Sequence, residues 1–347
     1  MPPAAPRRRL PAVLGLLLLL AAAPACSDGS AGSESPPPEP GAPAAAADSA
    51  ESPFWVDPRS AAARQVAAWE AAGRYSDAQV LRRISERPMA LWAPGGDPGP
   101  EIRRAGAGAR AAGRTLVLVA YNIPHRDCGR NPAGGAKDVR AYRSWIGAFA
   151  DGIAGTKAVV ILEPGALAHA VDGCVRAEHH AERYRLLSEA VDRLKRNRNT
   201  KVYLDAGSPA WIRNPADLVA PLRRAGLERA DGFALNVSDF QPEAAARAYG
   251  AELSKRAGNK HFVIDTGRNG DGPLPGDRAR SGCNPPGRSL GRAPTDGTGD
   301  PLVDAYLWVK RPGDSDGPCR GGPTTGTWWP DYALGLARRA KSGPAGT

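Results

Sequence analysis

The sequence lacks the short motifs that mark the common cofactor and nucleotide sites. No Gly-x-Gly-x-x-Gly segment opens a helix after a strand, and no phosphate-binding P-loop is present. The five cysteines and five histidines include no Cys-x-x-Cys pair and no histidine cluster at the spacing that zinc sites use. We therefore expect neither a cofactor nor a metal ion.

A concentrated basic patch is also missing. The formal net charge is +10, but the arginines are scattered over helical stretches such as residues 176–198. Proteins that bind nucleic acid gather such charges on one surface and interleave them with aromatic residues. We expect a solvated basic surface and no nucleic-acid partner.

No apolar run reaches the length of about 20 residues that a membrane span needs. The run from Leu10 to Ala23 follows three arginines and leads through small residues to Cys26. This order is typical of an export signal, and Ala25 before the cysteine is similar to a bacterial lipobox. We predict a signal peptide over residues 1–26 and export from the cytoplasm. Lipid attachment at Cys26 and ordinary cleavage nearby remain the two alternatives.

The rest of the chain divides into a tether and one domain. Residues 27–51 are rich in Ser, Gly, Pro, Glu and Ala without periodicity, which predicts a flexible tether. With 42% hydrophobic residues in the whole chain, residues 52–342 can bury one large core. We predict a single domain there.

The remaining cysteines form an even set. If Cys26 is lipidated or removed, three pairings of the other four are possible from the sequence alone. We favour Cys128 with Cys174 and Cys283 with Cys319. These pairs close loops of about 46 and 36 residues, and each contributes about 3–4 kcal/mol in the chain-entropy model.

Seven short apolar runs recur along the domain and alternate with amphipathic segments long enough for helices. This alternation predicts a parallel β/α architecture, and at this length a closed or nearly closed barrel. The expected strands are Pro88–Ala93, Thr115–Asn122, Ala158–Glu163, Lys201–Ala206, Gly232–Val237, His261–Thr266 and Leu302–Val309. The expected helices are Ala61–Ala72, Ser76–Ser85, Val139–Gly152, Ala177–Arg198, Pro215–Ala225 and Pro242–Ala257.

Carboxylates, tryptophans and amides follow the strands, at the edge where such folds carry their chemistry. Tryptophan stacks on the apolar faces of sugar rings, and carboxylates and amides bind hydroxyl groups, so this set favours a saccharide cleft. Asp205, Asp265 and Glu163 also fit a structural role, as acceptors from the backbone or, for Glu163, as an ion-pair partner. The strand-end residues are Trp92, Tyr121, Asn122, Arg126, Asp127, Glu163, Asp205, Ser208, Trp211, Asn236, Asp239, Asp265, Arg268, Asn269, Lys310, Asp314 and Asp316.

Five longer segments carry a family resemblance: residues 121–129 (YNIPHRDCG), 202–207 (VYLDAG), 261–270 (HFVIDTGRNG), 283–288 (CNPPGR) and 300–317 (DPLVDAYLWVKRPGDSDG). Through these segments, the chain resembles the family 6 glycoside hydrolases, which are endoglucanases and cellobiohydrolases acting on β-1,4-glucan. The resemblance covers about residues 52 to 340 and implies a distorted β/α barrel of about seven strands. The family pairing also favours the two disulfides chosen above.

The resemblance implies an inverting mechanism. A general acid protonates the glycosidic oxygen while a base activates water, the two carboxyl groups standing about 6.5–9.5 Å apart. By motif match, Asp316 takes the place of the base, and Asp127 that of an aspartate that assists the acid. Tyr121 resembles the tyrosine that presses on the distorted sugar. The candidate substrate-binding residues are Trp92, Ser208, Trp211, Asn236, Lys310 and Asp314.

Several positions depart from the family pattern. The family's acid is the aspartate of a Glu-Pro-Asp motif, and this chain has Gly165 there. Glycine cannot donate a proton, and loss of general acid assistance typically costs about 10²–10⁴ in rate. The other departures are Ser208 for histidine, Gly282 for tryptophan, Pro132 for serine and Gly267 for serine.

Three hypotheses follow. The chain hydrolyses β-1,4-glucan, weakly, with Asp127 or another carboxyl group as the donor. Alternatively, it is a catalytically impaired surface lipoprotein that binds glucan or another saccharide. The third hypothesis, a different saccharide as substrate, fits the changes at Ser208 and Gly282. Short segments at 131–138 and 271–282 favour an open groove, and we expect a monomer.

Overall fold

The computed structural model describes residues 52–129, 134–276 and 282–341 of the chain. The predicted signal peptide, the lipidation site Cys26 and the tether lie outside the described residues, and so does Pro132. No helix among the described residues is long and apolar enough to span a bilayer.

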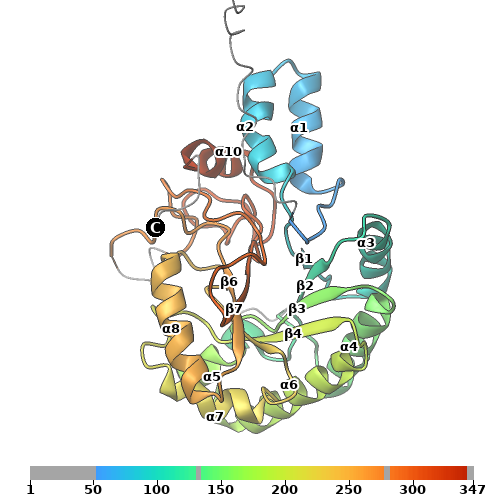
Figure 1. Cartoon of the computed structure of the whole chain (residues 1–347), viewed down its shortest axis with the longest axis vertical. Coiled ribbons are helices and arrows are strands. Elements are labelled where there is room, and N and C mark those ends of the chain that lie inside the picture. The colour runs from blue at the N-terminus through green and yellow to red at the C-terminus, as the bar shows by residue number, and fades with distance from the viewer. Residues whose placement is uncertain (1–51, 130–133, 277–281, 342–347) are drawn as a thin grey trace, which may run out of the picture. The chain divides into compact units, whose positions relative to one another are not determined.

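Seven strands form one sheet, and their order in the sheet follows the chain from β1 to β7 (Figure 1). Every neighbouring pair is parallel. The prediction of seven parallel strands is confirmed, and each strand lies within its predicted run to within one residue. The strands are β1 Leu91–Trp92, β2 Leu116–Ala120, β3 Ala158–Leu162, β4 Thr200–Asp205, β5 Gly232–Leu235, β6 His261–Asp265 and β7 Val303–Leu307.

Both faces of the sheet are buried. In β2, Val117 and Val119 pack with residues from the other strands, while Leu116 and Leu118 point to the opposite face and pack against helices. Successive side chains of a strand point to opposite faces, so a sheet covered on both sides needs apolar residues at nearly every position. This double cover is why the strands stand out in the sequence as continuous apolar runs.

The sheet curls, with β1 and β7 as its two edges. Near these edges, the backbone N–H of Ala90 donates to the carbonyl of Trp308 (3.0 Å). The indole N–H of Trp92 donates to the carbonyl of Val309 (2.8 Å). The predicted parallel β/α barrel is therefore confirmed in a distorted form, in which these hydrogen bonds link the edges.

Most of the helices between the strands surround the sheet and follow the predicted alternation, whereas the two N-terminal helices and the C-terminal helix pack together at one end (Figure 1). Helix α3 (Gly99–Ala111) was not predicted, because its glycines lower helix propensity. They serve close packing: a Cβ atom at Gly108 would lie 2.5 Å from the ring of Trp55. The other helices are α1 Ala61–Ala71, α2 Tyr75–Ser85, α4 Val139–Ile153, α5 Ala168–Val171, α6 His180–Lys195, α7 Ala216–Arg224, α8 Glu243–Arg256 and α10 Pro330–Arg339.

One of the two predicted disulfides is present. Cys283 and Cys319 are bonded, with their Cα atoms 6.3 Å apart. Cys174 is also disulfide-bonded, but the side chain of Cys128 lies outside the described residues. The pairing of Cys128 with Cys174 stays a prediction.

Candidate active site

Asp316 lies in the loop after β7, and 13% of its side chain is exposed. Its Oδ2 accepts hydrogen bonds from the guanidinium of Arg268 (2.7 Å) and the backbone N–H of Asn284 (3.0 Å). Its Oδ1 lies 3.2 Å from Nζ of Lys310. Burial alone would raise the pKa of this carboxyl group, but the two cations and the backbone donor hold the pKa of Asp316 below its usual value. Asp316 is therefore ionised, as a base must be.

Arg268 is the buried partner of this aspartate. It is 1% exposed, donates to the carbonyl of Ser238 (2.9 Å), and its guanidinium carbon lies 4.4 Å from the ring centre of Phe240. Burial opposes its charge, but the nearby Asp316 carboxylate raises the pKa of Arg268 overall. Because a buried charge without its partner is costly, Arg268 and Asp316 depend on one another.

The ends of β1 and β2 bring together a second group of predicted residues. The hydroxyl of Tyr121 donates to Oδ1 of Asp127, whose Oδ2 lies 3.5 Å from Nε of Arg126. Arg126 also stacks over the ring of Tyr121, at 4.3 Å from the ring centre, and the ring of Trp92 meets Tyr121 edge to face at 5.4 Å. Burial and the charge of Asp127 raise the pKa of Tyr121, so its hydroxyl stays protonated. The structure thus clusters Trp92, Tyr121 and Asp127, as the sequence predicts.

The end of β3 is different, because Gly165 has no side chain to offer. Its backbone is left-handed, with φ +76°, and its N–H donates to Oδ2 of Asp205 (2.7 Å). A Cβ atom at this position would lie 3.2 Å from the ring of His169 and 3.2 Å from the ring of Trp211. The space next to Gly165, where the resemblance expects an acid, is therefore bordered by two rings.

Two carboxyl groups close to this position are buried. Asp205 is 2% exposed, and its Oδ1 has no hydrogen-bond partner among the described residues. Glu163 is fully buried and accepts from the backbone N–H groups of Asn122 and Ile123 at 2.9–3.0 Å. Burial raises the pKa of Asp205 and of Glu163 to about 7, against the effect of their backbone donors. The ion pair expected for Glu163 is absent from the described residues, since its oxygens bind the backbone of the neighbouring strand end.

Asp265, at the end of β6, has the structural role predicted for it. Its Oδ1 accepts from the backbone N–H groups of Gly267 (2.9 Å) and Val309 (3.1 Å). Its Oδ2 accepts from those of Ser238 (3.0 Å) and Lys310 (2.9 Å). This carboxyl group therefore ties together the loops that follow β5, β6 and β7, including the one that carries Asp316.

The predicted substrate-binding residues differ in their access to solvent. Asn236 is fully buried and donates to the carbonyls of Gln241 (3.2 Å) and Asp265 (2.9 Å). Ser208 is 1% exposed and donates to the carboxylate of Asp239. Both support their loops through these hydrogen bonds, and their predicted contacts with a sugar stay predictions. The rings of Trp92 and Trp211, in contrast, are half-buried.

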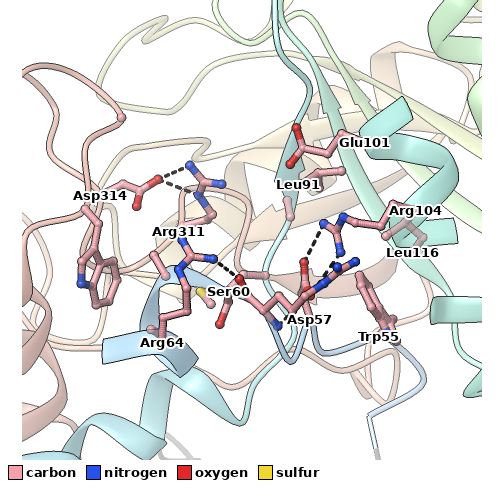
Figure 2. Close-up of a pocket in the computed structure, with 17 residues that line it drawn as sticks. Trp55, Asp57, Ser60, Arg64, Leu91, Glu101, Arg104, Leu116, Arg311 and Asp314 are labelled. Carbon is pink, nitrogen blue, oxygen red and sulfur yellow. Dashed lines mark hydrogen bonds and ion pairs between the residues drawn. The ribbon is translucent and has the colours of Figure 1, made fainter. Parts of the chain in front are cut away.

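Asp314 lies in a different environment from Asp316. It lines a cavity of about 530 Å³ that includes neither Asp316 nor Trp92. Figure 2 shows its ion pair with Arg311 and, elsewhere in the cavity wall, the pair of Arg104 with Asp57. The predicted sugar contact of Asp314 would therefore fall in this cavity, apart from the Asp316 carboxylate.

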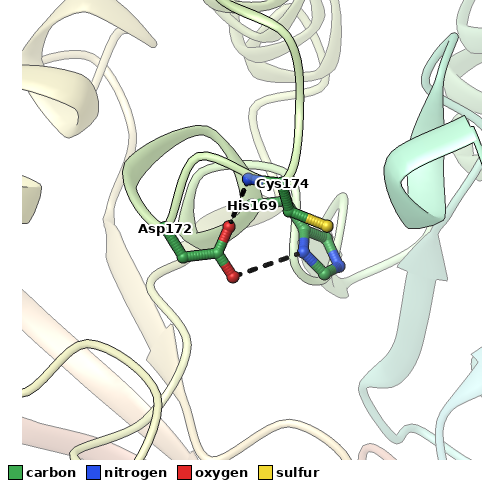
Figure 3. A group of neighbouring side chains, drawn as sticks. All are labelled: His169, Asp172 and Cys174. Carbon is green, nitrogen blue, oxygen red and sulfur yellow. Dashed lines mark hydrogen bonds and ion pairs between the residues drawn. The ribbon is translucent and has the colours of Figure 1, made fainter.

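A group of three side chains near Gly165 has the composition of a metal site. Potential ligand atoms of His169, Asp172 and Cys174 lie within 4.8 Å of one another (Figure 3). Cys174 is disulfide-bonded, so it has no thiolate to offer, and two ligands are too few for a structural zinc site. Asp172 instead accepts from the backbone N–H of Cys174 (2.9 Å) and from the indole N–H of Trp211 (2.8 Å).

Sequence reasoning named Arg268 and Lys310 but missed Asn284, the third residue that holds the candidate base. The side-chain oxygen of Asn284 accepts from the backbone N–H of Asp316 (2.7 Å), and the backbone N–H of Asn284 donates to the Asp316 carboxylate. The signal was the segment CNPPGR, which the resemblance includes without a role for its asparagine. The nearby segment Gly313–Gly317 also fits the Gly-x-Ser-x-Gly pattern, but Ser315 is fully buried and donates to the carbonyl of Pro323 (2.7 Å), so it is not a nucleophile.

The curled parallel sheet places carboxylates and tryptophans at the carboxyl ends of its strands, a set of groups that suits the binding of a saccharide. The sequence profile of the glycosyl hydrolases family 6 matches residues 49–340. The chain belongs to this family.

Named relatives agree with this assignment. The chain is 41% identical over 297 residues to Endoglucanase A of Cellulomonas fimi, covering 84% of this chain and 62% of that protein. It is 42% identical over 305 residues to Endoglucanase 1 of Streptomyces halstedii, covering 84% of this chain and 91% of the relative. The chain thus spans less than two thirds of the first relative.

A solved structure gives the same picture. The endoglucanase Cel6 from Mycobacterium tuberculosis, in complex with methyl-cellobiosyl-4-deoxy-4-thio-β-D-cellobioside, superposes with a TM-score of 0.76 and is 41% identical. The match covers 83% of this chain and 97% of that one. This similarity supports the distorted barrel independently of the strand count.

Proposed function

We propose that this protein cleaves β-1,4-glucan at internal bonds of the polysaccharide and inverts the configuration at the anomeric carbon. The observation that carries the proposal is the state of Asp316, an ionised carboxylate held by Arg268 and Lys310. Such a carboxylate can take a proton from water as the water attacks the anomeric carbon. The relatives, named as endoglucanases, supply the substrate class.

The remaining site residues bind the sugar. Trp92 and Trp211 each offer a half-buried ring on which a glucose unit can stack. Tyr121 keeps its hydroxyl on Asp127 and its ring against Trp92, so the two rings form one rigid wall. A rigid wall can hold a distorted sugar ring, which brings the anomeric carbon towards the planar geometry of the transition state.

The experiment uses the purified full chain with carboxymethyl cellulose and cellohexaose. We expect reducing ends to appear, and proton NMR of the first cellohexaose products to show the α-anomer before mutarotation. A β-anomer as first product would refute inversion. Release from another polysaccharide but not from β-1,4-glucan would refute the substrate, and binding of cellohexaose without cleavage would refute hydrolysis.

We also propose that the chain is exported and that Cys26 carries a lipid anchor. The support is the order of three arginines, an apolar run and small residues before this cysteine. Lipid labelling of the chain expressed in a bacterium tests it. We expect label on the wild type and none on Cys26→Ser, and an unlabelled wild-type chain would indicate ordinary cleavage.

A further inference from the structure

The β3 end of the site has no acidic side chain at Gly165, yet hydrolysis of a sugar–sugar bond needs a proton donor. A sugar alkoxide is a poor leaving group, and a proton donor typically raises the rate by about 10²–10⁴-fold. We propose that the imidazole of His169 is this donor, an inference that rests on the proposed function.

Local backbone geometry places His169 in the required position. The backbone N–H of His169 donates to the carbonyl of Gly165 (2.9 Å), which closes one helical turn at the start of α5. Residues four apart on such a turn share a face, so the side chain at 169 can reach the space that belongs to a side chain at 165. Two of the three heavy atoms nearest to a Cβ built at Gly165 belong to the His169 ring, Cδ2 at 3.2 Å and Nε2 at 3.3 Å.

Asp172 lies beside the ring. Nδ1 of His169 is 3.8 Å from Oδ2 of Asp172 (Figure 3). On the other side of the ring, Nε2 lies 3.3 Å from a Cβ atom built at Gly165. The ring also packs edge to face on Trp211, with ring centres 4.6 Å apart. To act as the donor, the imidazole must carry a proton on Nε2.

The neighbouring carboxyl groups are less suited to this task. Asp205 and Glu163 are 2% and 0% exposed, so both are less open to a glycosidic oxygen than His169 is. Asp127 is 40% exposed but is engaged by Tyr121 and Arg126 at the end of β2. The side chain of His169 is 21% exposed, and it borders the position where the resemblance expects the acid.

The reaction balances with these groups. Nε2–H of His169 gives its proton to the glycosidic oxygen as the bond from that oxygen to C1 breaks, and the bonding electrons stay on the oxygen. Water forms the new bond to C1 from the opposite face and gives one proton to Asp316. The products are a free 4-hydroxyl group and a sugar of inverted configuration. Solvent exchange then returns a proton to His169 and removes one from Asp316.

The test compares two substrates that differ in their need for an acid. Cellohexaose has a sugar leaving group, whereas 2,4-dinitrophenyl β-cellobioside releases a phenolate that leaves without protonation. We expect His169→Ala to lower kcat on cellohexaose by about 10²–10⁴-fold and to change kcat on the aryl substrate by less than about threefold. His261→Ala, at the start of β6, is the matched control and should leave both rates unchanged.

Each other outcome has a definite meaning. Equal losses on both substrates would mean that His169 only supports the loop, and no loss on cellohexaose would mean that it plays no part. A selective loss in Asp127→Asn but not in His169→Ala would assign the donor to Asp127. These three results overturn the inference alone. A wild-type chain that cleaves neither substrate would overturn the proposed function itself. If His169→Ala does not fold, His169→Asn keeps a polar planar side chain against Trp211 and allows the same comparison.

Discussion

The loops after β7 and after β3 provide the two halves of the candidate site, and they are built differently. After β7, Asp316 is fixed by two cations and a backbone N–H. After β3, Gly165 offers only its backbone, and the space beside it is bordered by His169 and Trp211. One half is a buried ionic network, and the other is a gap between rings.

The difference shows which half of a catalytic pair can change at low cost. Loss of Asp316 would leave Arg268 buried without its partner charge, so the base is linked to the stability of the fold. No buried cation faces Gly165 among its nearest contacts, and its N–H is already bound by Asp205. A carboxylate at position 165 would have the Asp205 carboxyl group as its neighbour, and no cation. Glycine in place of that carboxylate therefore leaves no buried cation without a partner.

The largest expected effect is on the β7 side. Asp316→Asn should lower kcat on cellohexaose by about 10²–10⁴-fold, because the amide cannot accept a proton from water. Steady-state kinetics measure this, with circular dichroism to show that the variant is folded. Asp192→Asn, which breaks an exposed ion pair with Arg229, is the control. A variant with near wild-type kcat would remove Asp316 from the mechanism.

The next effect concerns the link between the base and stability. Arg268→Met should reduce the free energy of unfolding by about 3–5 kcal/mol, because it leaves the Asp316 carboxylate without its buried partner. Arg143→Met removes an exposed pair with Glu189 and should cost at most about 1 kcal/mol. Urea denaturation gives both values. Similar small losses would show that the buried pair of Arg268 with Asp316 contributes no more to stability than an exposed pair does.

A smaller effect is expected at position 165 itself. Gly165→Asp should cost about 1–2 kcal/mol from the left-handed backbone alone, and its Cβ would crowd His169. With His169 present, we expect no gain in kcat. In the His169→Ala background, however, Gly165→Asp should restore part of the lost cellohexaose activity. The His169 ring no longer crowds the new carboxyl group, which can then protonate the glycosidic oxygen. Kinetics of the two single variants and the double variant check this, and a gain in the single Gly165→Asp variant would contradict it.

The smallest effect is a pH dependence of stability close to the β3 end. Burial raises the pKa of Glu163 from an ordinary 4.5 to about 7. Because the folded-state value is the higher one, the contribution of this group is fully present below about pH 4.5 and is lost as the pH rises through 7. The stability deficit of Glu163→Gln relative to the wild type should therefore shrink by about 1–2 kcal/mol between pH 6 and pH 8. Urea denaturation at the two pH values measures it, and a constant deficit would show that Glu163 does not titrate there.

The strands were predictable because their physics is local. Each is a short apolar run covered on both faces, and parallel strands joined by helices follow one another in the sheet. Helix α3 was not predictable, because its glycines are explained only by the approach of Trp55 from a distant part of the sequence. Propensity alone reads such glycines as breaks in a helix.

The site was predictable as a set of residues but not as a set of roles. Asp265, Asn236 and Asp316 all follow strands, yet only Asp316 combines partial exposure with two neighbouring cations. The backbone N–H groups that donate to the Asp265 carboxylate come from three different loops. The spacing of residues in the sequence does not show that these loops meet. The sequence showed that Gly165 stands where the acid is expected. It did not show that His169 lies beside Gly165, because this placement depends on the local turn between the two residues.

The most direct test of the central claim is the cleavage of cellohexaose by the unaltered full chain, followed by separation of the products. We expect internal cleavage to shorter cello-oligosaccharides, and no such products from Asp316→Asn. Binding of cellohexaose by calorimetry, without any products from the wild-type chain, would contradict it. The chain would then be a glucan-binding protein on a hydrolase fold.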